Sequence, residues 1–167
     1  MNKAAQIIIL RGNSGSGKTT TGKALQRKFG QGTMLISQDV VRREMLFVKD
    51  GPDTKACQLL LDLALYGKNN CDIVILEGIL NSKWYKSLFG NLLVEFKDQI
   101  FAYYFDIPFE ETLNRHQQKS NAHEFGEKEM RKWWNEKDLL GIIPEILLHK
   151  ELSLNEIVDI IYKDVIK

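Results

Sequence analysis

The chain has 167 residues, of which 44% are hydrophobic and 27% are charged, and its formal net charge at pH 7 is +1. This length favours one domain spanning residues 1–167 with a core that needs no disulfide or metal, and the near-neutral charge excludes no class of partner. The two cysteines form no CxxC pair, so we expect reduced thiols and a cytoplasmic protein. The aliphatic run at residues 7–10 is too short for a signal segment or a membrane span.

The first half of the chain alternates short apolar runs with longer segments of helical spacing. In chain order, the pattern predicts a strand at 7–10, a helix at 18–29, a strand at 34–37, and helices at about 39–45 and 54–66. Gly30 and Gly67 follow two of these helices, and we expect the helices to end there. Asp39 stands where it can cap the helix that begins at its position.

The second half continues the same alternation. In chain order, it predicts a strand at 72–76, a helix at about 82–96, a strand at 100–105, helices at 109–118 and 127–137, a short strand at 146–148, and a helix that Ser153 caps and that ends near 166. Strands that are apolar throughout and separated by helices are typical of a parallel sheet covered on both faces. We therefore expect a three-layer α/β/α fold around a parallel sheet of about five strands.

Residues 12–19, GNSGSGKT, match the phosphate-binding pattern G-x-x-x-x-G-K-[ST] and lie between a predicted strand and a predicted helix. Glycines let backbone N–H groups turn toward a phosphate, Lys18 adds a cation that serves catalysis, and Thr19 offers a hydroxyl to Mg²⁺. A glycine-rich turn without a ligand is the alternative, and packing or capping is the alternative for Thr20. The predicted nucleotide-binding residues are Gly12, Asn13, Ser14, Gly15, Ser16, Gly17, Lys18, Thr19 and Thr20.

Charged side chains follow two other predicted strands, at the sheet edge where ligands bind in open α/β folds. Asp39 follows the second strand and can accept the proton of an attacking hydroxyl, and Arg42 shares its helical face and can hold a polar or anionic substrate group. The alternatives are a helix cap for Asp39 and a solvated surface for Arg42. Glu77 ends the third strand and can bind a substrate hydroxyl or Mg²⁺-bound water, unless it makes only a local hydrogen bond.

Basic residues also follow the fourth predicted strand. Arg115 and Lys119 share a helical face, and a polar stretch continues from them. Mobile basic segments close over nucleotides in kinases, exclude water and neutralise γ-phosphate charge, so residues 115–130 are a candidate lid. A solvated charged helix is the alternative. We expect His116 and His123 to be exposed, since the histidines show no metal-ligand spacing.

Together these segments resemble a known family. The phosphate loop, SQDVVRREM at 37–45 and YFDIPFEETLNRHQQKS…EKEMRKWW from residue 104 onward are similar to the kinase domain of phage-type polynucleotide kinase and its small-molecule kinase relatives. Those relatives include chloramphenicol phosphotransferase, gluconate kinase and zeta-toxin-like kinases. The resemblance implies a P-loop NTPase fold with strand order 2-3-1-4-5 and a helical lid, and binding of ATP with Mg²⁺.

The resemblance also implies roles for single residues. Asp39 falls where the family has its general base, and Arg42 falls where it binds a substrate phosphate. Arg115 and Lys119 fall where lid cations stabilise the transferring phosphoryl group. Lys119 departs from the usual arginine and cannot form a bidentate fork with phosphate, which leaves Arg131 as another candidate lid cation.

The acceptor is a hydroxyl-bearing molecule that the sequence does not identify. Glu77-Gly78 replaces the aspartate and hydroxyl residue of polynucleotide kinases, which favours a small-molecule kinase. Our leading hypothesis is Mg²⁺-dependent transfer of the ATP γ-phosphate to such a hydroxyl. The alternatives are a 5′-hydroxyl polynucleotide or oligonucleotide kinase and a regulatory NTPase without an acceptor. The guanine-specifying N-K-x-D pattern is absent, which counts against a GTPase switch.

Overall fold

The computed structural model of the chain describes residues 3–120 and 122–167, so residue 121 of the candidate lid lies outside the described part. Five strands form one parallel sheet in the order β2-β3-β1-β4-β5, which confirms the predicted order. The strands are β1 (Gln6–Gly12), β2 (Thr33–Ser37), β3 (Ile73–Gly78), β4 (Ile100–Asp106) and β5 (Glu145–His149).

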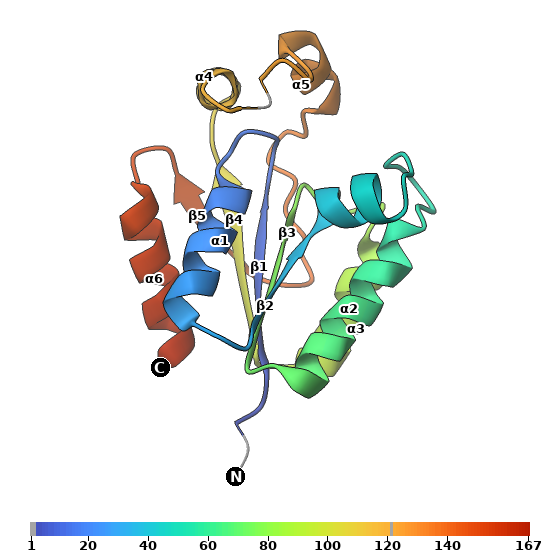
Figure 1. The fold of residues 1–167 in the computed structure, drawn as a ribbon, viewed down its shortest axis with the longest axis vertical. Helices are drawn as coiled ribbons and strands as arrows, with labels where there is room; N and C mark the ends of the chain where they lie inside the picture. Colours follow the sequence, from blue (N-terminus) through green and yellow to red (C-terminus); the bar gives the residue numbers. More distant parts are fainter. Residues whose placement is uncertain (1–2, 121) are drawn as a thin grey trace.

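Helices cover both faces of the sheet, as the apolar strands require (Figure 1). One face packs against α1 (Lys18–Phe29) and α6 (Leu154–Ile166), and the other against α2 (Ala56–Asn70) and α3 (Lys86–Phe96). The π-helix η1 (Val40–Met45), α4 (Phe109–Gln117) and α5 (Glu127–Trp133) lie beyond the carboxyl ends of the strands. No helix in the described ranges is long and apolar enough to cross a membrane.

The core divides into two layers because successive side chains of a strand point to opposite faces. In β1, Ile7 and Ile9 join the layer under α2 and α3, whereas Ile8 and Leu10 join the layer under α1 and α6. All four side chains are fully buried. β1 is thereby fixed in the centre of the sheet, and the loop that follows it emerges between its neighbours β3 and β4.

Three predicted helix boundaries are wrong, and the first is the start of α3, which lies at Lys86 and not near residue 82. Helix α2 does not end near Gly67 but continues to Asn70, because Gly67 is a packing residue and not a cap. A Cβ atom at Gly67 would lie 2.6 Å from Val74 Cγ2 and 2.9 Å from Met34 Sδ, so glycine lets the helix approach the sheet closely. Helix α5 ends at Trp133 and not near residue 137, since the backbone is already extended at Trp134.

Substitution of Gly67 by alanine is expected to destabilise the fold, because the new methyl group overpacks the contact with Val74. We expect the free energy of unfolding in urea to fall by about 1–3 kcal/mol. Gly90, inside α3, is the matched control, since a Cβ atom there meets nothing within 4 Å. Gly90→Ala should raise stability by roughly 0.5–1 kcal/mol through helix propensity. Equal effects of the two substitutions would show that Gly67 has no packing role.

Candidate active site

The loop at residues 12–19 has the backbone of a phosphate-binding loop. It connects β1 to α1, and Gly15 and Gly17 adopt φ angles of 77° and 107°, which favour glycine. A Cβ atom at Gly15 would lie 2.6 Å from the Thr112 carbonyl oxygen of α4, so no larger residue fits there. Thr20 is exposed in the first turn of α1. The loop therefore presents backbone N–H groups at a helix N-terminus, where an anion is stabilised.

Lys18 is buried at the centre of this loop. Its Nζ donates hydrogen bonds to the Asn13 carbonyl oxygen at 2.7 Å and to Ser16 Oγ at 3.3 Å. Burial lowers the pKa of Lys18 to about 8, although the negative charges of Glu77 and Asp39 oppose this shift. A bound phosphate would supply the countercharge that the buried ammonium group lacks.

Nucleotide affinity should therefore depend on pH above neutrality. The pKa of free Lys18 is about 8, and a bound triphosphate raises it, so binding takes up a proton as the pH passes through this range. Between about pH 7.5 and pH 9.5, we expect the Kd for AMPPNP to rise on the order of tenfold. Isothermal calorimetry in buffers of different ionisation enthalpy measures both the Kd and the proton uptake. A constant Kd without proton uptake would contradict a titrating Lys18.

Glu77 lies against Thr19, the predicted metal ligand. The Thr19 hydroxyl donates a hydrogen bond to Glu77 Oε1 at 3.0 Å, and Glu77 is buried. Burial raises the pKa of Glu77, and the Lys18 charge and hydrogen bonding with Ser37 and Thr19 oppose this shift. Of the two roles predicted for Glu77, binding of Mg²⁺-bound water is the one that this contact suits, because a carboxylate and a hydroxyl are oxygen donors that fit Mg²⁺ and its waters.

Few protein ligands are expected in such a metal site. Among the described residues, no group of three or more His, Cys, Asp or Glu side chains is placed to hold a metal. Mg²⁺ keeps several waters and takes further oxygens from phosphates, so Thr19 and Glu77 fit the protein share of a site completed by nucleotide.

Asp39 stands between the end of β2 and η1 and makes no capping hydrogen bond, so it does not act as the helix cap. Its side chain is 67% exposed, and its Oδ1 lies 3.5 Å from Arg42 Nη2. The Asp39 charge raises the pKa values of both Lys18 and Lys119, which opposes the effect of their burial. Arg42 donates to the Val48 carbonyl oxygen at 3.2 Å, and its buried Nε has no partner within the described part of the chain.

The two predicted lid cations, Arg115 and Lys119, are both linked to the phosphate loop and its carboxylates. Arg115 Nη1 donates to the Ser16 carbonyl oxygen at 2.8 Å, and its Nε donates to Glu111 at 3.0 Å. Partial desolvation lowers the pKa of Lys119, opposed by the charges of Glu77 and Asp39. Lys119 is therefore within electrostatic reach of both carboxylates.

Arg131, the other candidate lid cation, is engaged elsewhere. It forms an ion pair with Glu127 at 2.8 Å, and its guanidinium lies 4.2 Å from the Phe109 ring centroid. Both partners belong to α4 and α5 themselves. These contacts hold Arg131 away from the predicted role, which leaves Lys119 as the candidate for the second lid cation.

The expectation that His116 is exposed is wrong. His116 is buried, its Nε2 lies 2.7 Å from the Phe125 carbonyl oxygen, and its ring stacks on Phe125 at 4.2 Å between centroids. The guanidinium of Arg43, in η1, lies 5.9 Å from the centroid of the Phe125 ring. Phe125 thus joins the lid to the element that carries Arg42. No local sequence pattern predicts these contacts.

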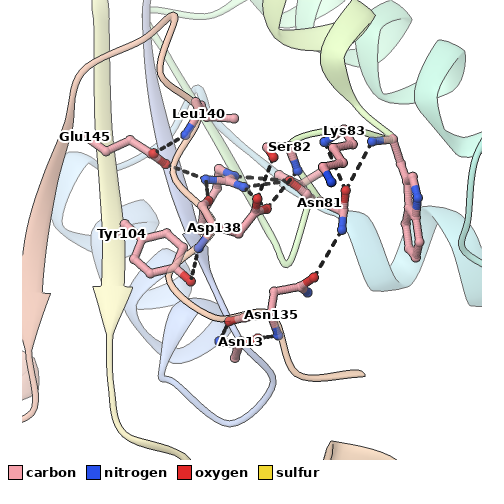
Figure 2. A network of polar contacts seen from close by, with 12 residues as sticks. Asn13, Asn81, Ser82, Lys83, Tyr104, Asn135, Asp138, Leu140 and Glu145 are labelled. Atoms are coloured by element: carbon pink, nitrogen blue, oxygen red, sulfur yellow. Dashed lines mark hydrogen bonds and ion pairs between the residues drawn. The ribbon is translucent and has the colours of Figure 1, made fainter. Parts of the chain in front are cut away.

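A polar network below the lid is also absent from the sequence-based predictions (Figure 2). Arg11, the residue before the loop, is fully buried and pairs with Asp138 at 2.8 Å and Glu145 at 2.7 Å. Both amide atoms of the Asn13 side chain bind the backbone of Asn135. The segment 134–138, which follows α5, is thereby held by the two neighbours of Gly12, Arg11 and Asn13.

A pocket of about 370 Å³ adjoins the phosphate loop at Asn13. The rest of its lining comes from the ends of β4 and β5, the residues that follow them, and the segment 134–137. Asp39, Arg42 and Glu77 do not line this pocket. This pocket is therefore separate from the three residues that the sequence predicts to contact an acceptor.

Comparisons with known proteins identify the family. A family model described as an AAA domain matches residues 7–136, which is more than half of the chain. No protein with a curated description matches the sequence.

Solved structures, two of them of kinases, share the fold. A gluconokinase from Sinorhizobium meliloti 1021 gives a TM-score of 0.69 at 14% identity, covering 99% of this chain and 94% of that one. An APS kinase from Mycobacterium tuberculosis in complex with AMPPNP and APS gives 0.69 at 16%, covering 99% and 100%. A tunicamycin resistance protein from Deinococcus radiodurans gives 0.60 at 17%, covering 96% and 95%. The chain therefore has the P-loop kinase fold, and its sequence makes it a member of the AAA domain family.

Proposed function

We propose that this protein is a phosphotransferase that moves the γ-phosphate of ATP to a hydroxyl of a small-molecule acceptor. The observation that carries the proposal is the contact of charged side chains with the phosphate loop: Glu77 accepts a hydrogen bond from Thr19 at 3.0 Å, and Arg115 donates one to the Ser16 carbonyl oxygen at 2.8 Å. The charges of Asp39 and Lys119 also act on the buried Lys18. The fold that this protein shares with a gluconokinase and an APS kinase supports the same class of reaction.

In this proposal, each group has one role. The loop N–H groups and Lys18 hold the β- and γ-phosphates, while Asp39 accepts the proton of the attacking hydroxyl. Arg115 and Lys119 stabilise the negative charge on the transferring group and exclude water from it. Positioning and charge stabilisation account for most of the catalysis in such reactions.

Thr19 and Glu77 would hold Mg²⁺ or its waters in this scheme. When bound, the ion neutralises charge on the β- and γ-phosphate oxygens. Glu77 has to be ionised to help, and its raised pKa means that burial works against the charged form. A cation beside the carboxylate reverses that effect, so Glu77 is suited to a site that is complete only when nucleotide and metal are present.

The acceptor would lie beside η1, where Arg42 can contact its polar or anionic group. The partly exposed Asp39–Arg42 pair and the unpartnered Nε of Arg42 support this placement. We include in the proposal that residues 1–167 form one cytoplasmic domain with a lid at about residues 115–130. A 5′-hydroxyl nucleic-acid end and water remain the competing acceptors to be tested.

A transfer screen with radiolabelled ATP tests the proposal. Nucleosides, sugars, antibiotics and 5′-hydroxyl oligonucleotides are offered separately, and labelled products are separated from inorganic phosphate. We expect one small-molecule class to be labelled, with a KM that depends little on salt. Labelling of oligonucleotides with steep salt dependence would instead assign the polynucleotide reaction. Release of inorganic phosphate alone would assign an NTPase.

A further inference from the structure

One residue outside the predicted site links three of its parts. Asn135 lies two residues after the end of helix α5, whose first turn belongs to the candidate lid. We call the segment 134–138 the lid exit. Its backbone N–H donates to Asn13 Oδ1 at 2.8 Å, and its carbonyl oxygen accepts from Asn13 Nδ2 at 2.7 Å. Its side-chain Oδ1 accepts from Asn81 Nδ2 at 3.2 Å (Figure 2). These contacts join the phosphate loop, the lid exit and the loop between β3 and α3.

Each neighbour of Asn135 is itself fixed to a functional element. The Asn13 carbonyl oxygen accepts the hydrogen bond from Lys18 Nζ at 2.7 Å, so the residue that binds Asn135 also binds the loop lysine. Asn81 lies three residues beyond Gly78, and its Oδ1 accepts from the N–H groups of Lys83 and Trp84 at 3.0 and 3.2 Å. The Asn81 side chain therefore sets the turn that leads from Glu77 into α3.

The surrounding network makes these contacts rigid. Three residues after Asn135, Asp138 pairs with the fully buried Arg11 and accepts a hydrogen bond from the Ser82 backbone N–H at 2.8 Å. The Asn13 side chain is buried as well, so its amide has no competing water. A buried polar group that loses its partner pays the full cost of desolvation, so the Asn13–Asn135 pair resists separation.

From this arrangement we propose that Asn135 is a positioning residue, which couples the state of the phosphate loop to the β3–α3 loop and to the lid exit. A phosphate bound to Lys18 competes with the Asn13 carbonyl oxygen for the Lys18 ammonium group, and a shift of Asn13 that follows would be transmitted to the backbone of Asn135. The Asn135 side chain passes that displacement to Asn81. This role rests on the proposed function, because it assumes that the loop holds nucleotide while the β3–α3 loop borders the acceptor.

The link can be tested in the free protein by hydrogen exchange of the Lys83 and Trp84 amides, which bind Asn81. We expect Asn13→Ala to accelerate their exchange about fivefold, the population change that one net hydrogen bond supports. In an Asn135→Ala background, Asn13→Ala should leave both rates unchanged, because the link is already broken. Asn91→Ala is the matched control, since within the described residues the Asn91 side chain binds only Ser87 of its own helix.

Additive effects of Asn13→Ala and Asn135→Ala, or no effect of Asn13→Ala, would overturn the coupling. Asn135→Asp retains an oxygen acceptor for Asn81, so in this background Asn13→Ala should again accelerate exchange of the Lys83 and Trp84 amides. A merely structural defect at position 135 would not be reversed selectively at these two amides. In a second arm, AMPPNP with Mg²⁺ should slow these two amides in the wild type about fivefold more than in Asn135→Ala. If AMPPNP does not bind the wild type, the proposed function fails, while the double-mutant comparison in the free protein still decides the coupling.

Discussion

Replacing Lys18 with alanine is expected to lower kcat/KM for ATP by at least about a hundredfold. Lys18 is the buried cation of the phosphate loop, and burial has already lowered its pKa to about 8. Without it, the β- and γ-phosphates lose a charge-assisted hydrogen bond in a site with little competing water. Steady-state kinetics of phosphate release and product formation measure the change.

The same substitution should leave the protein folded. Burial of the Lys18 ammonium group costs desolvation free energy in the folded protein. Lys18→Ala removes this cost together with two hydrogen bonds, so the two effects on stability oppose each other. Lys23→Ala is the matched control, since Lys23 is exposed on the same helix. A Lys18→Ala protein that turns over ATP at the wild-type rate would show that the loop is not the nucleotide site.

Replacing Asp39 with asparagine is expected to slow phosphoryl transfer by about 10²–10⁴-fold, the usual contribution of a general base. The amide has nearly the same shape as the carboxylate and cannot accept the hydroxyl proton. Nucleotide affinity should change little, because the loop N–H groups and Lys18 carry it in this scheme. Single-turnover kinetics with excess enzyme separates the transfer step from nucleotide binding.

Asp39→Asn should change the free energy of unfolding little, so a loss of stability would not explain the slower transfer. The ion pairs of Asp39 with Arg42 and Arg43 are long, at 3.5 and 3.8 Å, and the carboxylate is largely exposed. Such exposed pairs contribute at most about 1 kcal/mol. Asp98→Asn is a suitable control, because Asp98 is exposed between α3 and β4, at the opposite edge of the sheet. Transfer at the wild-type rate in Asp39→Asn would remove Asp39 from the role of base.

The sequence predicts the parts of the site that lie in one segment or at strand ends. The loop at residues 12–19 is a contiguous motif, and its backbone has the expected form. Asp39 follows β2 and Glu77 is the penultimate residue of β3, and the carboxyl ends of parallel strands share one edge of the sheet. Their proximity to Lys18 follows from the topology, and the roles assigned to them stay predictions.

The remaining features depend on contacts between distant segments. Asn13 and Asn135 are 122 positions apart, and Arg11 and Asp138 are 127 apart, so no local pattern connects them. The same contacts explain why the helix predicted to reach residue 137 ends at Trp133: the chain has to extend at Trp134 before Asn135 meets Asn13. Gly67 reads as a helix end from sequence because only the sheet beside it reveals the close contact.

The central claim is that the γ-phosphate leaves the loop for a hydroxyl and not for water. Its most direct test is the partition of radiolabel from ATP between acceptor and inorganic phosphate, measured for the wild type with each acceptor class. We expect that one class receives most of the label and that Asp39→Asn slows this transfer by about 10²–10⁴-fold. Label recovered only as inorganic phosphate, at a rate that no acceptor class changes, would contradict it.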